Sequence, residues 1–249
     1  MINQEIETLF SKTKILATLG PATANKNILK ELIQVGVDGV RLNFSHGDYS
    51  FYGSLFQEIH AACEEESKPL AVFLDLQGPK IRIGDLKKPE IEIISGDEIE
   101  ITVEKIKGDS KKISTSYFPL PVDANINDII LIDDGLIKLK VKTKTKNSVV
   151  CEIINGGILK PKKGMNLPGM KLSTPSITEK DWEDLKFAVK YRVDYVGLSF
   201  VRKPEEIIEL KNWLKENKLD IKVIAKIEKK EGVDNFESIL QVADGIMVA

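Results

Sequence analysis

The chain has 249 residues, of which 42% are hydrophobic and 30% are charged, a composition typical of a globular protein that buries a sizeable core. Its formal net charge of −2 creates no overall field toward nucleic acid or membranes, so we expect neither as a partner. No apolar run is long enough to span a bilayer, and residues 1–12 lack the pattern of a secretion signal. The sequence therefore predicts a cytoplasmic protein. Cys63 and Cys151 lie far apart without metal-ligand or redox spacing, which favours buried, reduced thiols.

Strand and helix patterns alternate in the first third of the chain. Buried strands are predicted at 13–19, 37–44 and 70–76, with amphipathic helices at 25–35 and 49–66. Gly36 is placed to end the first helix. Such alternation is typical of parallel strands joined by crossover helices.

The pattern changes at about residue 82. From there to about 170, short runs with a two-residue period are separated by Gly, Asp and Asn turns, which predicts a small all-β barrel domain. Strand and helix alternation then resumes, with helices at 178–191, 203–217 and 230–243 and strands at 193–200, 222–227 and 245–249. We therefore expect three segments: 1–81 as the first part of an α/β domain, 82–170 as an inserted domain, and 171–249 as the second part.

Six parallel strands are predicted for the α/β domain. A (β/α)8 TIM-type barrel closes at eight, so we expect a barrel truncated after about six strands. An open doubly wound sheet is the alternative, but no glycine-rich dinucleotide turn follows the first strand.

Three charged segments stand at expected strand ends. Residues 41–47 (RLNFSHG) present a guanidinium, an amide, a hydroxyl and an imidazole, which suit a phosphorylated ligand or simply form a solvated loop. Residues 74–82 (LDLQGPKIR) place charges around a Gly-Pro turn, which fits a hinge or the base of a closing lid. Lys226 and Glu228 point to the same face of a strand, either as an ion pair or as a phosphate-neutralising base beside a ligand for a hard cation.

Long motifs throughout the chain resemble the pyruvate kinase family. They are ATLGPAT, RLNFSHG, LDLQGPKIRIG, IDDGLI, NGGILKPKKGMNLPG, LSFVRK, KIEKKEGV and DGIMVA, all in the family's order and spacing. The resemblance implies a barrel domain with a lid domain inserted after its third strand. It also implies phosphoryl transfer between phosphoenolpyruvate and ADP, giving pyruvate and ATP in glycolysis.

The resemblance assigns roles to particular residues. Arg41 is expected to contact the substrate phosphate, and Lys226 to bind substrate and stabilise the transferring phosphoryl group. Glu228 is expected to be a ligand of Mg²⁺ or Mn²⁺. The residues expected along the nucleotide are Asn43, Phe44, Ser45, His46, Arg82 and Lys163.

One departure from the family concerns K⁺. Asn43, Ser45 and Asp75 match its K⁺ ligands, but Leu76 and Lys80 stand where many members have Thr and Glu. Because the Lys80 ammonium would supply the charge of K⁺, and two neighbouring cations repel, we expect that K⁺ is not required.

A second departure concerns the end of the sequence. The family continues beyond Ala249 with the second metal carboxylate, the last strands and a regulatory domain, and its full-length members form homotetramers. We therefore expect residues 1–249 to be an incomplete and inactive fragment. Two alternatives remain: a non-catalytic nucleotide-binding module, and a metal-dependent oxoacid lyase, which would leave the inserted domain unexplained.

Overall fold

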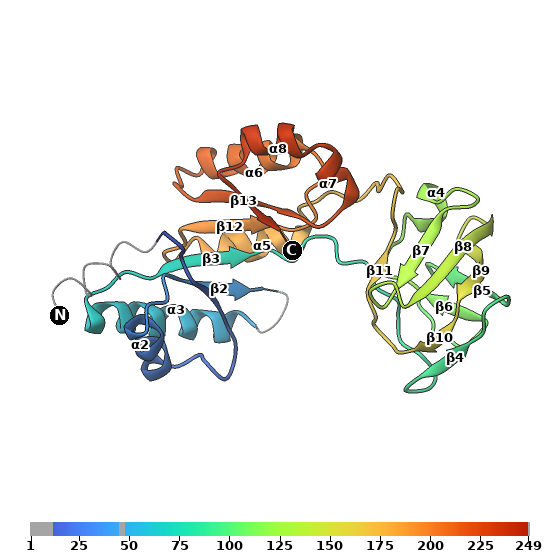
Figure 1. The fold of residues 1–249 in the computed structure, drawn as a ribbon, viewed down its shortest axis with the longest axis horizontal. Helices are drawn as coiled ribbons and strands as arrows, with labels where there is room; N and C mark the ends of the chain where they lie inside the picture. Colours follow the sequence, from blue (N-terminus) through green and yellow to red (C-terminus); the bar gives the residue numbers. More distant parts are fainter. Residues whose placement is uncertain (1–11, 45–47, 249) are drawn as a thin grey trace. The chain divides into compact units, whose positions relative to one another are not determined.

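The computed structural model describes residues 12–44 and 48–248. It divides the chain into two compact units, which Figure 1 shows as ribbons. Unit 1 comprises Met1–Gly78 and Ser176–Ala249, and unit 2 comprises Pro79–Pro175. The sequence analysis placed the insertion at 82–170, whereas the division falls at Pro79 and Pro175. At the first of these points Gly78 has φ +65°, a conformation that glycine adopts without strain.

Unit 1 contains a six-stranded parallel sheet with the order β1-β2-β3-β12-β13-β14. Within the described residues β1 and β14 are its two edges. The strands are β1 (Leu16–Leu19), β2 (Gly39–Asn43), β3 (Ala71–Asp75), β12 (Tyr195–Leu198), β13 (Lys222–Ile227) and β14 (Gly245–Val248).

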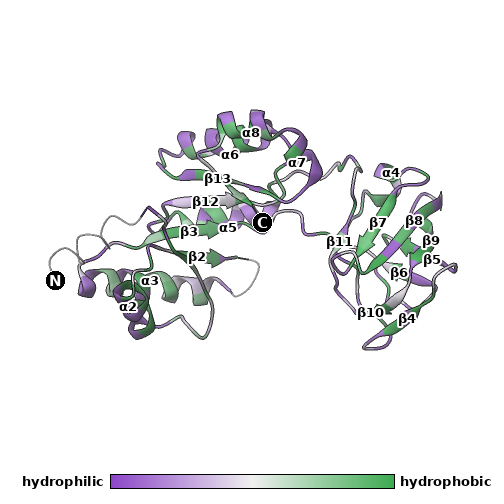
Figure 2. Cartoon of the chain, viewed as in Figure 1, coloured by the Kyte–Doolittle hydropathy of each residue, from purple (hydrophilic) through white to green (hydrophobic). Residues whose placement is uncertain are grey.

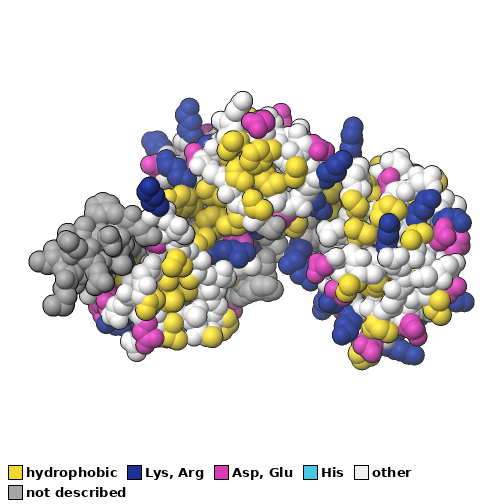
Figure 3. All heavy atoms as spheres, viewed as in Figure 1, with side chains coloured by type: hydrophobic (Ala, Val, Ile, Leu, Met, Phe, Trp, Pro, Cys, Tyr) yellow, Lys and Arg dark blue, Asp and Glu magenta, His cyan; other side chains and the backbone are white. Residues whose placement is uncertain are grey.

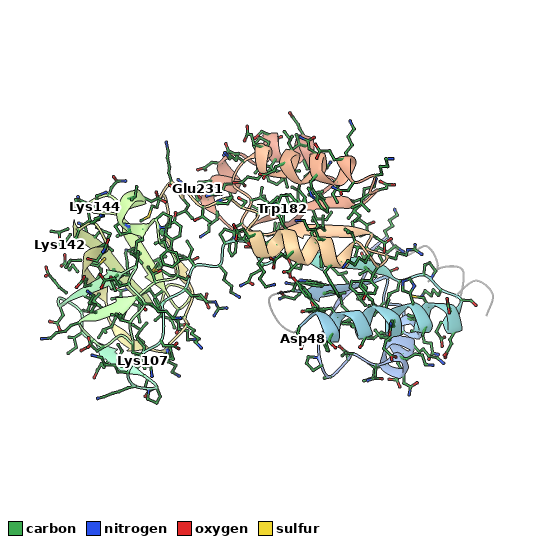
Figure 4. The ribbon with its side chains drawn as sticks, turned by 180° about the vertical axis from the view of Figure 1, so that it is seen from behind. Asp48, Lys107, Lys142, Lys144, Trp182 and Glu231 are labelled. Atoms are coloured by element: carbon green, nitrogen blue, oxygen red, sulfur yellow. The ribbon has the colours of Figure 1, made fainter. Side chains whose placement is uncertain are left out.

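Crossover helices connect these strands: α2 (Lys26–Gln34), α3 (Tyr49–Glu66), α5 (Glu179–Ala188), α6 (Pro204–Glu216), α7 (Lys230–Asp234) and α8 (Phe236–Val242). Local sequence sets where they begin. Asp48 caps α3 by accepting a hydrogen bond from Phe51 N at 2.8 Å, and Figure 4 labels it at the start of that helix. Thr178 and Asp181 form a capping box at the start of α5.

The prediction of one helix over 230–243 was wrong. The segment forms α7 and α8, separated at Asn235, whose φ of −101° and ψ of 16° lie outside the helical region. The Asn235 side chain donates a 2.8 Å hydrogen bond to the carbonyl of Arg202, an attachment that competes with a continuous helix.

The strands of unit 1 have two different faces because successive side chains alternate. One face is buried beneath the helices, as the core residues Val40, Leu42, Val72, Leu74, Val196 and Val223 show. The opposite, inner face carries Gly39, Arg41, Phe73, Asp75, Ile224 and Lys226. At the amino-terminal ends of the strands this inner face forms an open apolar groove lined by Leu16, Phe73, Ile224 and Met247. Figure 3 shows hydrophobic side chains exposed on this unit.

Unit 2 is a β structure with its own core. Its main sheet has the order β11-β7-β8-β9-β5-β6, and β10 pairs with β4 in a second sheet. The strands are β4 (Ile91–Ile93), β5 (Glu98–Thr102), β6 (Lys112–Ser114), β7 (Ile129–Ile132), β8 (Ile137–Lys144), β9 (Ser148–Asn155), β10 (Gly157–Leu159) and β11 (Met165–Asn166). Figure 2 shows β7 as hydrophobic and β8 with alternating colours, and the inward residues Ile130, Ile132, Leu139 and Val141 are buried.

The sequence predicted that the inserted domain is all β, but unit 2 also contains a short helix. It contains the one-turn helix α4 (Leu120–Asp123), which Pro119 and Pro121 favour because the fixed φ of proline suits a first helical turn. From the end of β8, Lys144 Nζ donates to the carbonyl of Ala124 at 2.6 Å, just past the end of α4. Figure 4 shows Lys142 and Lys144 near one end of unit 2.

The parallel α/β architecture of unit 1 is the TIM-type fold that the sequence predicted. Among the described residues, none of the helices combines the length and the apolar character needed to cross a membrane.

Candidate active site

Polar side chains of unit 1 gather on the inner face, where the strands end. In the sheet register Asn43 lies beside Asp75, and Asp75 lies beside Gly197, two residues before Ser199. Leu198 lies beside Ala225, one residue before Lys226. Because the strands are parallel, their carboxyl ends meet at one edge of the sheet. Asp75, Ser199 and Lys226 are therefore brought together from three strand ends.

Asp75 is the hub of this cluster. Its side chain is only 3% exposed, and its Oδ2 accepts from Arg41 Nε at 2.8 Å and also from Arg41 Nη2. Its Oδ1 lies 2.9 Å from Lys226 Nζ, an ion pair whose angle does not make a hydrogen bond. The carboxylate thus holds two cations in one place. The sequence analysis had placed Asp75 in the charged hinge segment 74–82 and among the K⁺ ligands of the family, but had not paired it with Arg41 and Lys226.

Arg41 is held at one end and exposed at the other. Besides Asp75, its Nη1 lies 3.3 Å from Thr18 Oγ1, and 28% of its side chain is exposed. A guanidinium has five N–H donors in a planar fork, so an arginine anchored in this way can also contact an anion.

Lys226 is buried and surrounded by oxygen atoms. Its Nζ donates to Ser199 Oγ at 2.7 Å and lies 3.1 Å from Glu228 Oε1. The pairing with Glu228 follows from the two-residue strand period that the sequence shows. Ser199 was missed by sequence reasoning. Its place at the end of a predicted strand was the available signal, but serine in such a place is commonplace.

The residues after β2 have separate environments. The Phe44 ring is 2% exposed and stacks on Tyr52, with ring centroids 3.9 Å apart, so this side chain is part of the core. Its carbonyl accepts from Lys180 Nζ at 3.2 Å, and the Asn43 carbonyl accepts from the Tyr52 hydroxyl at 2.6 Å. The Phe44 side chain is therefore not available to contact a nucleotide, and its backbone N–H donates to the carbonyl of Asp75 at 3.3 Å. Ser45 and His46 lie outside the described residues.

Lys180 also pairs with a buried carboxylate. Its Nζ lies 2.5 Å from Asp184 Oδ2, while the Tyr49 hydroxyl donates to Asp184 Oδ1 at 2.9 Å. Burial, together with the hydrogen bond to Asp184, raises the pKa of Tyr49 to about 12. Through Lys180 and Asp184, α5 thus holds both the Phe44 carbonyl and the Tyr49 side chain.

Lys229 comes directly after Glu228 in the sequence. Burial lowers the pKa of its ammonium, against the opposing effect of Glu231 and Glu228. Its Nζ lies 5.5 Å from the centre of the Phe200 ring.

Unit 2 has a charged cluster of its own. Arg82 and Gly164 form an antiparallel bridge, and Arg82 Nη1 donates to the carbonyl of Lys162 at 2.7 Å. Lys163 Nζ lies 2.8 Å from Asp133 Oδ1. The structure thus brings Arg82 and Lys163 close together within one unit. Lys80 also belongs to this unit, so its expected role beside Asp75 stays a prediction.

Few carboxylates are available for a metal ion. Within the described residues, no group of three or more His, Cys, Asp or Glu side chains is arranged to hold one. Asp75 is occupied by Arg41 and Lys226, which leaves Glu228, with 16% of its side chain exposed, as the carboxylate at the edge of the cluster. One carboxylate suits Mg²⁺, which commonly takes one or two together with water and substrate phosphates.

The fold and the site together define a class of protein. A TIM-type barrel domain, interrupted by a β domain and carrying a charged cluster where its strands end, has the arrangement of a barrel enzyme. The family model described as pyruvate kinase, barrel domain, matches residues 10–249, and the chain belongs to the pyruvate kinase family.

Individual relatives agree with this assignment. The chain is 43% identical over 240 residues to a pyruvate kinase of Staphylococcus aureus strain MRSA252 and 42% identical to that of strain USA300, with 96% of this chain covered in each case. A crystal structure of a pyruvate kinase from Cryptosporidium parvum matches 98% of this chain with a TM-score of 0.91 and 37% identity. The chain spans 41% of the length of the two bacterial relatives and 52% of the solved chain.

Proposed function

We propose that this chain carries the phosphoryl-transfer site of a pyruvate kinase, acting between phosphoenolpyruvate and ADP to give pyruvate and ATP in glycolysis. The observation that carries the proposal is the buried Lys226 ammonium, held between Asp75 and Glu228 where the strands end. Phosphoryl transfer depends mostly on positioning and charge stabilisation, and a fixed ammonium provides both.

Arg41 is proposed to bind the phosphate of the substrate. Asp75 fixes the guanidinium from one side and leaves part of it exposed, which favours binding of an anion in one orientation. Lys226 is proposed to neutralise the charge of the phosphoryl group during its transfer. Its ammonium pairs with the same carboxylate, Asp75, as Arg41, so the two cations lie close together.

The charges of the cluster support a metal requirement. The two cations, Arg41 and Lys226, are balanced by the two carboxylates, Asp75 and Glu228. A multiply charged phosphate substrate therefore enters a site with no net positive charge and benefits from an added cation. We propose Glu228 as a ligand of Mg²⁺ or Mn²⁺, which would supply Lewis-acid charge stabilisation. We also propose that K⁺ is not required, because Lys80 stands at the hinge position.

Residues of each unit are proposed separately for contacts with nucleotide. Arg82 and Lys163 provide cationic groups for phosphates in unit 2, and the segment Asn43–His46 provides backbone and polar groups in unit 1. Tetramer formation remains a proposal for full-length proteins of the family.

The test uses a coupled assay to measure the formation of pyruvate from phosphoenolpyruvate and ADP in the presence of Mg²⁺. We propose that residues 1–249 alone do not turn over, whereas a protein that extends this chain to the length of its relatives should do so, and Lys226→Met in that protein should not. Lys222→Met is the matched control, because Lys222 lies four residues earlier on the same face of β13, is half exposed and pairs with Asp220. Equal activity of the two variants would contradict the assigned role of Lys226.

A second candidate is nucleotide binding without turnover. The Arg82 and Lys163 cluster within unit 2 favours it, because its contacts do not depend on unit 1. Calorimetric titration with ADP separates the two functions. Binding that is weakened by Lys163→Met, in a protein that forms no pyruvate, would support the second candidate.

A further inference from the structure

Ser199 is the nearest oxygen neighbour of the Lys226 ammonium. Its Oγ lies 2.7 Å from Lys226 Nζ, compared with 2.9 Å for Asp75 Oδ1 and 3.1 Å for Glu228 Oε1. An ammonium has three N–H groups, and a hydrogen bond from one of them to a fixed oxygen restricts its orientation. Of these three oxygen neighbours, Ser199 Oγ is the closest to the ammonium, and it belongs to a neutral group.

The hydroxyl of Ser199 also has a fixed direction. Its Oγ donates to the carbonyl of Leu76 at 2.7 Å, and a hydroxyl has only one proton to donate. The Lys226 ammonium must therefore be the donor in its contact with Ser199. Ser199 is 3% exposed and Leu76 is 1% exposed, so water does not compete at either bond.

Ser199 packs against the turn through which the chain leaves unit 1. Leu76 is two residues before Gly78, where φ is +65°. A Cβ atom added at Gly78 would lie 3.2 Å from Ser199 Cβ and 3.3 Å from the Ser199 carbonyl oxygen. Gly78 N in turn donates to the buried carboxylate of Asp181 at 3.1 Å. The turn is thus fixed on one side by α5 and touches Ser199 on the other.

We propose that Ser199 is a positioning residue that fixes the Lys226 ammonium and connects it to the backbone of the Leu76–Gly78 turn. The contact itself is independent of any reaction, whereas its effect on turnover rests on the function proposed above. Without the hydroxyl, Lys226 would keep only its two ionic neighbours and would change orientation more freely.

The direct test measures how readily Lys226 is acetylated. The protein is treated with a limiting amount of an N-hydroxysuccinimide acetate, and labelling of Lys226 is quantified by mass spectrometry against labelling of the half-exposed Lys222. Ser199→Ala should raise this ratio about tenfold, since a hydrogen bond to a charged group is worth at least about a factor of ten. Ser199→Cys keeps nearly the same size but bonds weakly, and should raise the ratio as well.

Ser176→Ala is the matched control. Ser176 is also a buried serine of unit 1, but its hydroxyl accepts from Arg202 Nη2 at 3.1 Å. The proposal is overturned if Lys226 labelling is unchanged in a folded Ser199 variant, or if Ser176→Ala raises it equally. Because Ser199→Cys fills the same space, it decides the question if Ser199→Ala does not fold.

Turnover measured on the same variants separates the two proposals. Ser199→Ala should lower kcat while KM changes little, because the contact acts on a group needed most in the transition state. A rise in labelling without pyruvate formation by any variant would uphold the positioning of Lys226 and reject the proposed reaction. Pyruvate formation together with unchanged labelling of Lys226 would support the proposed reaction and reject the positioning role of Ser199.

Discussion

Lys226 Nζ lies 2.9 Å from Asp75 Oδ1, although β13 and β3 are separated in the sheet by β12. Gly197 of β12 is level with Asp75 on one side and with Ile224 on the other, so it has no side chain beside Asp75. A Cβ atom there would lie 3.5 Å from Asp75 Oδ1 and only 2.6 Å from the Phe73 ring. The missing side chain at Gly197 therefore makes room for the Phe73 ring, while Ser199, two residues later, contacts Lys226 directly.

The first prediction concerns Asp75→Asn. This change leaves Arg41 and Lys226 without their shared carboxylate, and breaking a buried ion pair usually costs about 3–5 kcal/mol. We expect a decrease of about this size in the free energy of unfolding, measured with urea and followed by the fluorescence of Trp182 and Trp213. Asp220→Asn is the control, because Asp220 is 92% exposed and its pairing with Lys222 should matter little. A similar midpoint for both variants would contradict the role of Asp75 as the hub.

The second prediction concerns Lys226→Met in a protein that shows turnover. We expect kcat to fall at least about a hundredfold while KM changes little, since the ammonium acts mainly on charge that develops in the transition state. The coupled pyruvate assay measures both constants. A variant that raised KM and kept kcat would instead make Lys226 a ground-state binding residue.

Much of the fold could be predicted from periodicity. The change from strand and helix alternation to a two-residue period, and back again, predicted the TIM-type fold and its β insertion. The same two-residue period placed Lys226 and Glu228 on one face. The break at Asn235 could not be predicted, because it depends on a hydrogen bond to the carbonyl of Arg202, 33 residues earlier in the chain.

The site was less predictable for the same reason. The motifs indicated which segments carry charge, but the pairing of Asp75 with Arg41 and Lys226 depends on which strands are neighbours and in what register. Phe44 was expected to lie along the nucleotide, like its neighbours in the motif RLNFSHG. Its side chain nevertheless belongs to the core, because strand alternation directs it away from the face that carries Arg41 and Asn43.

The third prediction compares Gly78→Ala with Gly36→Ala. Both glycines have positive φ, but a Cβ at Gly36 would meet nothing within 4 Å, whereas at Gly78 it would press on Ser199 and Phe200. Both changes should destabilise unit 1 by about 1 kcal/mol through backbone strain. Only Gly78→Ala should also change the acetylation of Lys226. Equal labelling in the two variants would show that the turn and Lys226 are not coupled.

The last prediction concerns the pH dependence of unit 2. Burial, reinforced by the hydrogen bond to Asp123, raises the pKa of Tyr117 to about 12, and Ser173 N also donates to the Tyr117 and Asp123 oxygens. Because this pKa is above the value of about 10 in an unfolded chain, the folded state favours the neutral phenol. The resulting stabilisation is fully present below about pH 10 and is lost as pH rises toward 12.

Tyr117→Phe tests this dependence directly. The difference in phenolate absorbance between the parent and Tyr117→Phe should show one group that titrates near pH 12 in the folded protein and near 10 in denaturant. At neutral pH the variant should lose about 1 kcal/mol through the missing hydrogen bond. Asp123→Asn should lower the pKa of Tyr117 but keep it above its ordinary value, because burial is the larger cause and remains. A Tyr117 phenol that titrates near 10 in the folded protein would show that its environment is not the one described.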